Sequence, residues 1–262
     1  ELKMLRVARR LGEALPLQVR TTLLAAHALP EEYKHDRAGY LCLITDELLP
    51  AVADEKLADF IDVFCETNYF TVAEMERVLE AGARFGLPGK VHVNQFTSLG
   101  AIRAAVKHGA LSVDHLEVME EADLFALDGA ATIPTLLPSC SFFLRIPYAP
   151  ARAIIDRGCA VALATDHNPG STPSGNMNLV VSLACIQLRM LPAEAINAST
   201  LNAAAAMGLA HELGSITVGK RASLIITRPV PSLAYLPYSF GSDHIDTVII
   251  DGKPERSGEA LA

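Results

Sequence analysis

The chain has 262 residues, of which 50% are hydrophobic, 20% are charged and 6% are aromatic, and its formal net charge is −8. This length supports a large hydrophobic core, and the composition excludes disordered, collagen-like and low-complexity chains. Because the negative charge repels phosphates and no local cluster of Lys and Arg offsets it, we expect a small-molecule substrate and no nucleic-acid partner.

The cysteines and the hydropathy pattern indicate in which cell compartment the protein is expected. No pair has the Cys-x-x-Cys spacing, and each cysteine lies in an apolar run, so we expect reduced core residues. There is neither a secretory signal peptide nor an apolar stretch of about 20 residues that would span a bilayer. The expected location is therefore cytoplasmic, without membrane attachment. The five cysteines are Cys42, Cys65, Cys140, Cys159 and Cys185.

The chain begins with Glu1 and enters at once a helical pattern of apolar residues, so we expect a start within a longer protein. Short apolar runs then alternate with amphipathic runs, which is typical of successive βα units and a parallel sheet. The predicted strands are Thr21–His27, Phe60–Cys65, Lys90–Gln95, Ser112–Leu116, Ala131–Leu137 and Cys159–Asp166. The predicted helices include Thr71–Arg84, Leu99–His108, Asn176–Arg189 and Pro192–Gly208.

After Gly214 the pattern changes to short strands separated by turns, predicted over Ser215–Val218, Ser223–Thr227 and Thr247–Ile250. Six αβ strands are two fewer than a (β/α)8 barrel requires. The expected fold class is therefore α/β, a partial TIM-type (β/α)8 barrel over residues 1–212 that lacks the first strands. Residues 213–262 are expected to form the C-terminal portion of a small β-sandwich.

Polar residues gather where the predicted strands end. They are His27, His92 with Gln95, Asp114 with His115, and Asp166 followed by His167 and Asn168. In a parallel αβ barrel the carboxyl ends of the strands form the active-site face, so we expect these side chains to converge. The pattern predicts a catalytic site at this face.

The residue types suggest metal chemistry. A neutral imidazole and a carboxylate are suitable ligands for Zn²⁺ or Fe²⁺, which makes His92 and Asp166 the candidate ligands. His115 is the candidate general base, because its ordinary pKa lies near neutral pH. The loop Thr165–Ser171 would present the backbone N–H groups of Gly170 and Ser171 to a substrate carboxylate.

Each of these residues also has a purely structural interpretation. His27 would then be a hydrogen-bonded core residue, and Asp114 would cap or turn the chain. The Asn-Pro-Gly sequence at 168–170 would form only a tight turn. The remaining histidines, which lie in polar or helix-terminal contexts, are expected to be surface residues: His35, His108, His211 and His244.

Several blocks resemble the imidazolonepropionases of the amidohydrolase superfamily. They are Ala-His-Ala at 26–28, Asp-Val-Phe-Cys-Glu at 62–66, Lys-Val-His-Val-Asn-Gln at 90–95, Ser-Val-Asp-His-Leu-Glu at 112–117, Leu-Leu-Pro at 136–138, Ala-Thr-Asp-His-Asn-Pro-Gly-Ser at 164–171 and Gly-Ser-Ile-Thr-Val-Gly-Lys at 214–220. They occur in the family's order over nearly the whole chain. The resemblance covers about the C-terminal two-thirds of such an enzyme.

The resemblance implies one divalent or trivalent metal ion, zinc or iron, with His92 and Asp166 at the positions of two family ligands. The family's other two ligands come from a His-x-His sequence, which this chain does not contain. By the same comparison His115, Asp166 and Gln95 match catalytic positions. The positions that match substrate-binding residues are His27, Gln95, Asn168, Gly170 and Ser171.

The implied activity is hydrolysis of the ring amide C–N bond of 4-imidazolone-5-propanoate to N-formimino-L-glutamate, a step of histidine degradation. A metal-activated water would attack the ring carbonyl, His115 would assist the proton transfer, and Asp166 would relay a proton to the departing ring nitrogen.

Two alternatives remain open. One is a nucleobase-type aminohydrolase with the same strand-end residues. The other is an inactive fragment or binding domain that lacks the His-x-His ligands, because two ligands in place of four weaken metal binding. We expect the isolated chain to be inactive or prone to aggregation and the complete protein to be active. A homodimer is the default expectation for its assembly.

Overall fold

The computed structural model describes residues 1–255, which fold as two compact units. The first unit comprises Glu1–Thr135 with Asp156–Cys159, and the second comprises Leu136–Ile155 and the chain from Ala160 onward. None of the helices described in either unit is both long enough and apolar enough to span a membrane.

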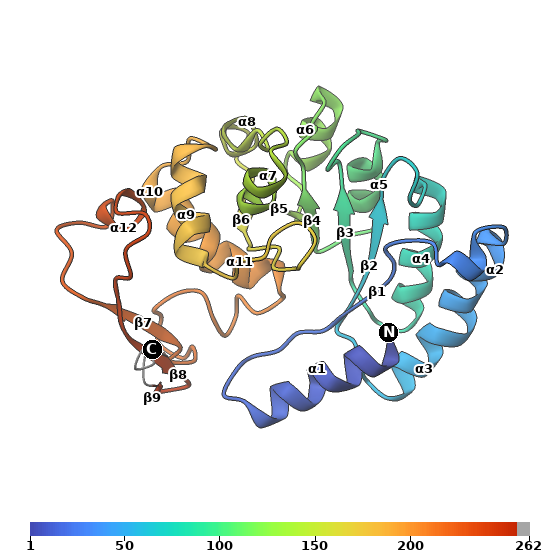
Figure 1. The fold of residues 1–262 in the computed structure, drawn as a ribbon, viewed down its shortest axis with the longest axis horizontal. Helices are drawn as coiled ribbons and strands as arrows, with labels where there is room; N and C mark the ends of the chain where they lie inside the picture. The colour runs from blue at the N-terminus through green and yellow to red at the C-terminus, as the bar shows by residue number, and fades with distance from the viewer. Residues whose placement is uncertain (256–262) are drawn as a thin grey trace. The chain divides into compact units, whose positions relative to one another are not determined.

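The elements alternate between strands and helices over most of the chain (Figure 1). From the N-terminus to the fifth strand they are α1 (Leu2–Ala14), β1 (Thr22–Ala26), η1 (Glu31–Tyr33), α2 (Arg37–Cys42), η2 (Leu43–Leu48), α3 (Leu49–Asp54), β2 (Phe60–Cys65), α4 (Val72–Arg84), β3 (Gly89–Val93), α5 (Ala101–Lys107), β4 (Ser112–His115), α6 (Glu121–Leu127) and β5 (Ile133–Leu136). There follow α7 (Pro138–Leu144), α8 (Ala151–Asp156), β6 (Ala162–Leu163), α9 (Met177–Ile186), α10 (Pro192–Ser199), α11 (Leu201–Ala206), β7 (Leu224–Thr227), α12 (Tyr235–Tyr238), β8 (Ile245–Ile250) and β9 (Lys253–Glu255).

The larger sheet has six strands in the order β1-β2-β3-β4-β5-β6, and the pairs from β1 to β5 are parallel. Each of the six predicted αβ strands is present, although β6 contains only two residues. This consecutive order of parallel strands, each followed by a helix, is that of a partial (β/α)8 barrel. The α/β class and the partial barrel predicted from the sequence are confirmed.

The two faces of the sheet differ in polarity because side chains alternate along a strand. One face of β2–β4 carries Ile61, Val63, Val91, Val93 and Val113, which are all at most 1% exposed. The other face carries polar side chains in register: Asp62 lies opposite Lys90, and His92 lies opposite Asp114. The apolar face provides the core, and the polar face provides the candidate site.

Helix α4 packs beside β2 and is well specified by its sequence (Figure 1). Thr71 and Glu74 form a capping box, in which each side chain accepts a hydrogen bond from the other residue's backbone N–H. The helix ends before Gly86, which adopts a φ of +72°. At Gly82 the strand approaches so closely that a Cβ would lie 2.5 Å from Cγ2 of Ile61.

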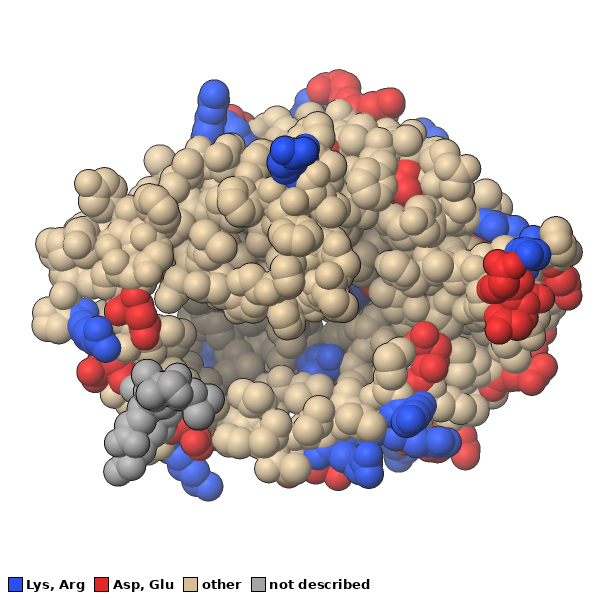
Figure 2. Space-filling model, in the orientation of Figure 1, with Lys and Arg blue, Asp and Glu red and all other residues tan. Residues whose placement is uncertain are grey.

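Helix α1 is amphipathic, as its apolar spacing predicts, and Leu5 is its buried residue. Lys and Arg side chains gather over α1 (Figure 2). Several of these cations pair with acidic residues of the same unit: Arg6 with Glu55, and Arg9 with Asp59.

In the second unit, β7, β8 and β9 form an antiparallel sheet. The strand predicted over Ser215–Val218 is wrong. This segment is irregular and leads into a turn, in which the N–H of Lys220 donates to the carbonyl of Thr217, and Ile216 and Val218 are exposed. The sheet lies inside the expected C-terminal segment 213–262, whose boundary stays a prediction.

Two further expectations require correction. The helix predicted over Pro192–Gly208 is interrupted at Thr200, where φ is −125° and ψ is −86° and the side-chain hydroxyl donates to the carbonyl of Ile196. All five cysteines are free thiols, but only two are fully buried, and Cys42 is exposed at the end of α2. Its Sγ accepts a hydrogen bond from Arg77.

The close contact of α4 with β2 predicts the effect of a single methyl group. Gly82→Ala should reduce the free energy of unfolding by about 2 kcal/mol, because the buried Ile61 has little room to move. Chemical denaturation measures this difference. Gly175→Ala is the matched control, since nothing lies within 4 Å of its added Cβ. An equal effect of both substitutions would contradict this account of the packing.

Glu74 predicts a pH-dependent contribution to stability. Burial raises the pKa of Glu74, but hydrogen bonds from Arg37 and Thr71 outweigh it, and the pKa falls below its ordinary value of 4.5. The contribution is therefore present above pH 4.5 and lost as the pH falls through the lowered pKa. Glu74→Gln should cost about 1 kcal/mol at pH 7 and almost nothing in strong acid. Unfolding curves against pH, with the exposed Glu80→Gln as control, test this; parallel curves would refute it.

Candidate active site

His92, on the polar face of β3, is held by a carboxylate of the neighbouring strand. Its Nδ1 atom lies 2.8 Å from Oδ2 of Asp62, and its backbone N–H donates to Oδ1 of the same carboxylate at 3.2 Å. Asp62 is 3% exposed. A carboxylate at this distance favours the proton on Nδ1, which leaves the lone pair of the imidazole on Nε2. Asp62 thereby favours this tautomer of His92 and fixes its backbone through the N–H.

A second carboxylate, Asp114 on β4, completes the polar face. Ser112 donates to its Oδ1 at 2.8 Å, and Nζ of Lys90 lies 3.9 Å from its Oδ2. Burial raises the pKa of Asp114, but Lys90, His92 and the hydrogen bonds lower it below its ordinary value of 3.8. Asp114 is therefore an ionised partner in a buried network, and not simply a turn residue.

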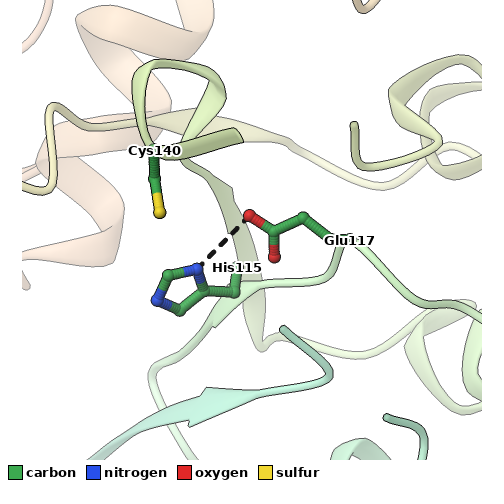
Figure 3. Close-up of side chains that lie close together, drawn as sticks. All are labelled: His115, Glu117 and Cys140. Carbon is green, nitrogen blue, oxygen red and sulfur yellow. Dashed lines mark hydrogen bonds and ion pairs between the residues drawn. The ribbon is translucent and has the colours of Figure 1, made fainter. Parts of the chain in front are cut away.

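His115, at the end of β4, shows the same arrangement as His92. Its Nδ1 lies 3.3 Å from Oε1 of Glu117, and both side chains are buried (Figure 3). The backbone of His115 and of the following Leu116 is left-handed, with φ of +89° and +69°. Two consecutive non-glycine residues in this region are uncommon, and such strain concentrates at functional sites.

The predicted histidines of the first unit lie in one row. The ring centroids of His92 and His115 are 5.5 Å apart, and those of His27 and His92 are 6.4 Å apart. His27 is exposed at the end of β1 and stacks on Phe64 at 5.3 Å. The structure therefore brings together three of the histidines that the sequence places at strand ends, and His27 is not a core residue.

In the second unit, the segment after β6 gathers four of the predicted residues. Oδ1 of Asn168 accepts hydrogen bonds from the N–H groups of Gly170 and Ser171 at 2.9 and 2.8 Å. The hydroxyl of Ser171 donates to Oδ2 of Asp166 at 3.1 Å. The two N–H groups predicted to bind a substrate carboxylate thus already donate to Asn168, so a ligand there would have to replace that acceptor.

Sequence reasoning missed the carboxylates that face the histidines, Asp62 and Glu117. Both occur in blocks noted for their family resemblance, but neither ends a predicted strand. For Asp62 a signal exists, because an Asp within the apolar run Phe60–Cys65 requires a buried partner. Its partner becomes evident only from the register between β2 and β3.

Comparisons with known proteins agree with this geometry. The family model described as "Amidohydrolase family" matches residues 23–254. The chain belongs to the amidohydrolase family.

Curated relatives narrow the comparison. The chain is 56% identical over 97% of its length to an imidazolonepropionase of Flavobacterium johnsoniae and, over the same share, 56% identical to one of Christiangramia forsetii. An imidazolonepropionase of Geobacillus kaustophilus is 44% identical over 97% of the chain. The chain spans 62% of the length of the first two relatives and 59% of the third, close to the two-thirds expected from the sequence. Its match to the C-terminal part stays a prediction.

Solved structures support the fold. An adenosine deaminase from Xanthomonas campestris with bound zinc matches 96% of this chain and 64% of its own, with a TM-score of 0.76 and 20% identity. Atrazine chlorohydrolase TrzN from Arthrobacter aurescens complexed with zinc matches 98% of the chain and 65% of its own, with a TM-score of 0.74 and 17% identity. At these identities the likeness concerns the fold alone.

Proposed function

We propose that the protein hydrolyses the ring amide C–N bond of 4-imidazolone-5-propanoate to N-formimino-L-glutamate, a step of histidine degradation. The observation that carries this proposal is the 56% identity to proteins named imidazolonepropionase, over nearly the whole chain. The paired arrangement of His92 and His115 with buried carboxylates supports it, because it provides basic imidazole nitrogens at adjacent strand ends.

The surroundings of His92 fit a metal ligand. With its Nδ1 proton facing Asp62, His92 presents Nε2, the atom a metal would accept, and a carboxylate behind a ligating histidine is the usual supporting arrangement. Zinc or iron, when bound, would lower the pKa of a water molecule and polarise the substrate carbonyl. His92 and Asp166 are the proposed ligands from this chain, and the choice between zinc and iron stays open.

His115 is the proposed general base. Glu117 faces Nδ1, which leaves Nε2 of His115 as the acceptor of a proton from the attacking water. The buried carboxylate also stabilises the imidazolium that forms. Asp166 is proposed to return a proton to the departing ring nitrogen.

The proposed substrate contacts are residues at the ends of the barrel strands and in the loops that follow them. They are His27, Gln95, Asn168, Gly170 and Ser171. The exposed His27, stacked on Phe64, is suited to contact a flat ring, whereas an anionic group at the Asn168 loop would have to replace Oδ1 of Asn168 as the acceptor of two backbone N–H groups. The homodimer and the cytoplasmic location stay predictions.

Turnover by the purified full-length protein tests the activity. We expect loss of the imidazolone absorbance and formation of formiminoglutamate without release of ammonia. His115→Asn should lower kcat by at least about a hundredfold, the usual contribution of a positioned general base. His108→Asn is the matched control, because His108 pairs with Glu76 away from the site.

Ammonia release from a nucleobase would instead favour the aminohydrolase alternative. Absence of any turnover and of stoichiometric metal would favour the inactive fragment or binding domain. Removal of the metal by a chelator should abolish activity, and added zinc or iron should restore it. Full activity in the chelated protein would contradict the metal-dependent proposal.

Asp62 predicts a separate effect on metal affinity. Asp62→Asn keeps the size of the side chain but removes the charge that favours Nδ1–H on His92. We expect about a 10- to 100-fold weaker affinity for zinc, measured by competition with a chromophoric chelator. Asp54→Asn, at an exposed position at the end of α3, is the control for loss of one charge. Unchanged affinity in Asp62→Asn would show that this carboxylate does not support the ligand.

A further inference from the structure

The segment of residues 94–98, here called the Gln95 loop, connects β3 to α5 and carries a proposed substrate contact. Gln95 is 8% exposed, and the preceding Asn94 has a left-handed φ of +56°. Partners outside the loop hold it in place. The structure provides them through two buried carboxylates on neighbouring βα units.

The first carboxylate is Glu66, which directly follows β2 and is 2% exposed. Its Oε2 accepts hydrogen bonds from the backbone N–H groups of Phe96 and Thr97 at 2.8 and 3.1 Å. Its Oε1 accepts from the N–H of Thr67 at 2.7 Å and from the hydroxyl of Thr97. Four donors from two segments therefore converge on one carboxylate.

The backbone of Glu66 is itself fixed. Its N–H donates to the carbonyl of Phe70 at 3.1 Å, and its carbonyl accepts from the N–H of Tyr69 at 2.9 Å. Phe70 is fully buried. The carboxylate thus projects from a closed turn that is anchored in the core. Its position does not depend on the Gln95 loop, so it can hold that loop in place.

The second carboxylate is Asp123, on α6, which is also 2% exposed. Its Oδ2 accepts from Nδ2 of Asn94 at 2.9 Å and from the hydroxyl of Ser98 at 3.0 Å. Nδ2 of Asn94 also donates to the carbonyl of Val118 at 2.8 Å. Glu66 therefore holds residues 96 and 97, Asp123 holds residues 94 and 98, and Gln95 lies between the two anchors.

The chemistry of the donors explains why both anchors are acids. An ionised carboxylate is acceptor-only and has about four lone-pair sites, whereas an amide of the same shape directs N–H groups at donors. All the donors named here are neutral groups, so the buried charge is stabilised by hydrogen bonds to it. Both oxygens of Glu66 accept hydrogen bonds, so an isosteric amide at this position must leave some of these donors without an acceptor.

We propose that Glu66 and Asp123 are positioning residues that fix the Gln95 loop from its two sides, and so orient Gln95 toward substrate. The role of Gln95 rests on the proposed function, whereas the holding of the loop does not. Neither acid needs to touch the substrate. Their effect on the reaction must therefore pass through Gln95.

Hydrogen exchange in the full-length protein tests the holding of the loop. Glu66→Gln should accelerate amide exchange at Phe96 and Thr97 at least about tenfold, the loss expected for hydrogen bonds to a charged acceptor. Glu32→Gln, at an exposed position on η1, removes the same charge and should leave this exchange unchanged. Unchanged exchange in Glu66→Gln overturns the proposal, whether or not the enzyme turns over the imidazolone.

A double-mutant cycle tests the path through Gln95. Glu66→Gln should lower kcat/KM about tenfold in the wild-type background but have almost no further effect in Gln95→Ala, because the loop then has nothing to orient. Asp123→Ala, which removes the acceptor of Asn94 and Ser98, should behave in the same way. Equal losses in both backgrounds overturn the proposal.

Two possible results, a Glu66→Gln variant that does not fold and a wild-type protein without activity, each call for a further measurement. If Glu66→Gln fails to fold, Glu66→Asp keeps the charge on a shorter side chain and should show an intermediate acceleration of exchange at residues 96 and 97. A folded Glu66→Asp with wild-type exchange and kcat/KM overturns the proposal. If the wild-type protein does not open the imidazolone ring, the proposed function fails, and the exchange experiment still decides the holding of the loop.

Discussion

A carboxylate facing the Nδ1 atom of a histidine is the interaction on which the proposed chemistry depends. It occurs twice on neighbouring strands, between Asp62 and His92 and between Glu117 and His115. In both cases it selects the tautomer whose lone pair is on Nε2. The Nε2 atom is thus the proposed metal ligand in His92 and the proposed proton acceptor in His115.

This arrangement places charge on a sheet face that is normally filled by branched apolar side chains in barrels of this kind. Buried charges cost stability unless hydrogen bonds and opposite charges replace the lost water, which Lys90 and Ser112 do for Asp114. The opposite face must then supply the hydrophobic stabilisation. Its valines and isoleucine, together with the close approach at Gly82, provide a dense contact with the outer helices.

Much of the fold is predictable from the sequence because buried parallel strands are nearly continuous apolar runs. For this reason Phe60–Cys65 is predicted to the residue and the other barrel strands within a few residues. The strand-end histidines are equally visible, since polar residues interrupt an apolar pattern there. The roles of Asp62, Glu66 and Asp123 cannot be predicted in this way, because they depend on strand register and on the paths of the loops. Ser215–Val218 has the composition of a strand but is irregular in the structure and leads into a turn.

The contacts of Glu66 with the Gln95 loop have a consequence for how this family diversifies. Glu66 binds the N–H groups of Phe96 and Thr97, which every residue except proline possesses, so the path of the loop depends little on the side chain at 96. Position 95 lies between the anchors and takes part in none of these hydrogen bonds. A substitution at position 95 leaves the hydrogen bonds of the anchors to residues 94, 96, 97 and 98 in place. Selection for a new substrate can therefore act at one position on an inherited scaffold.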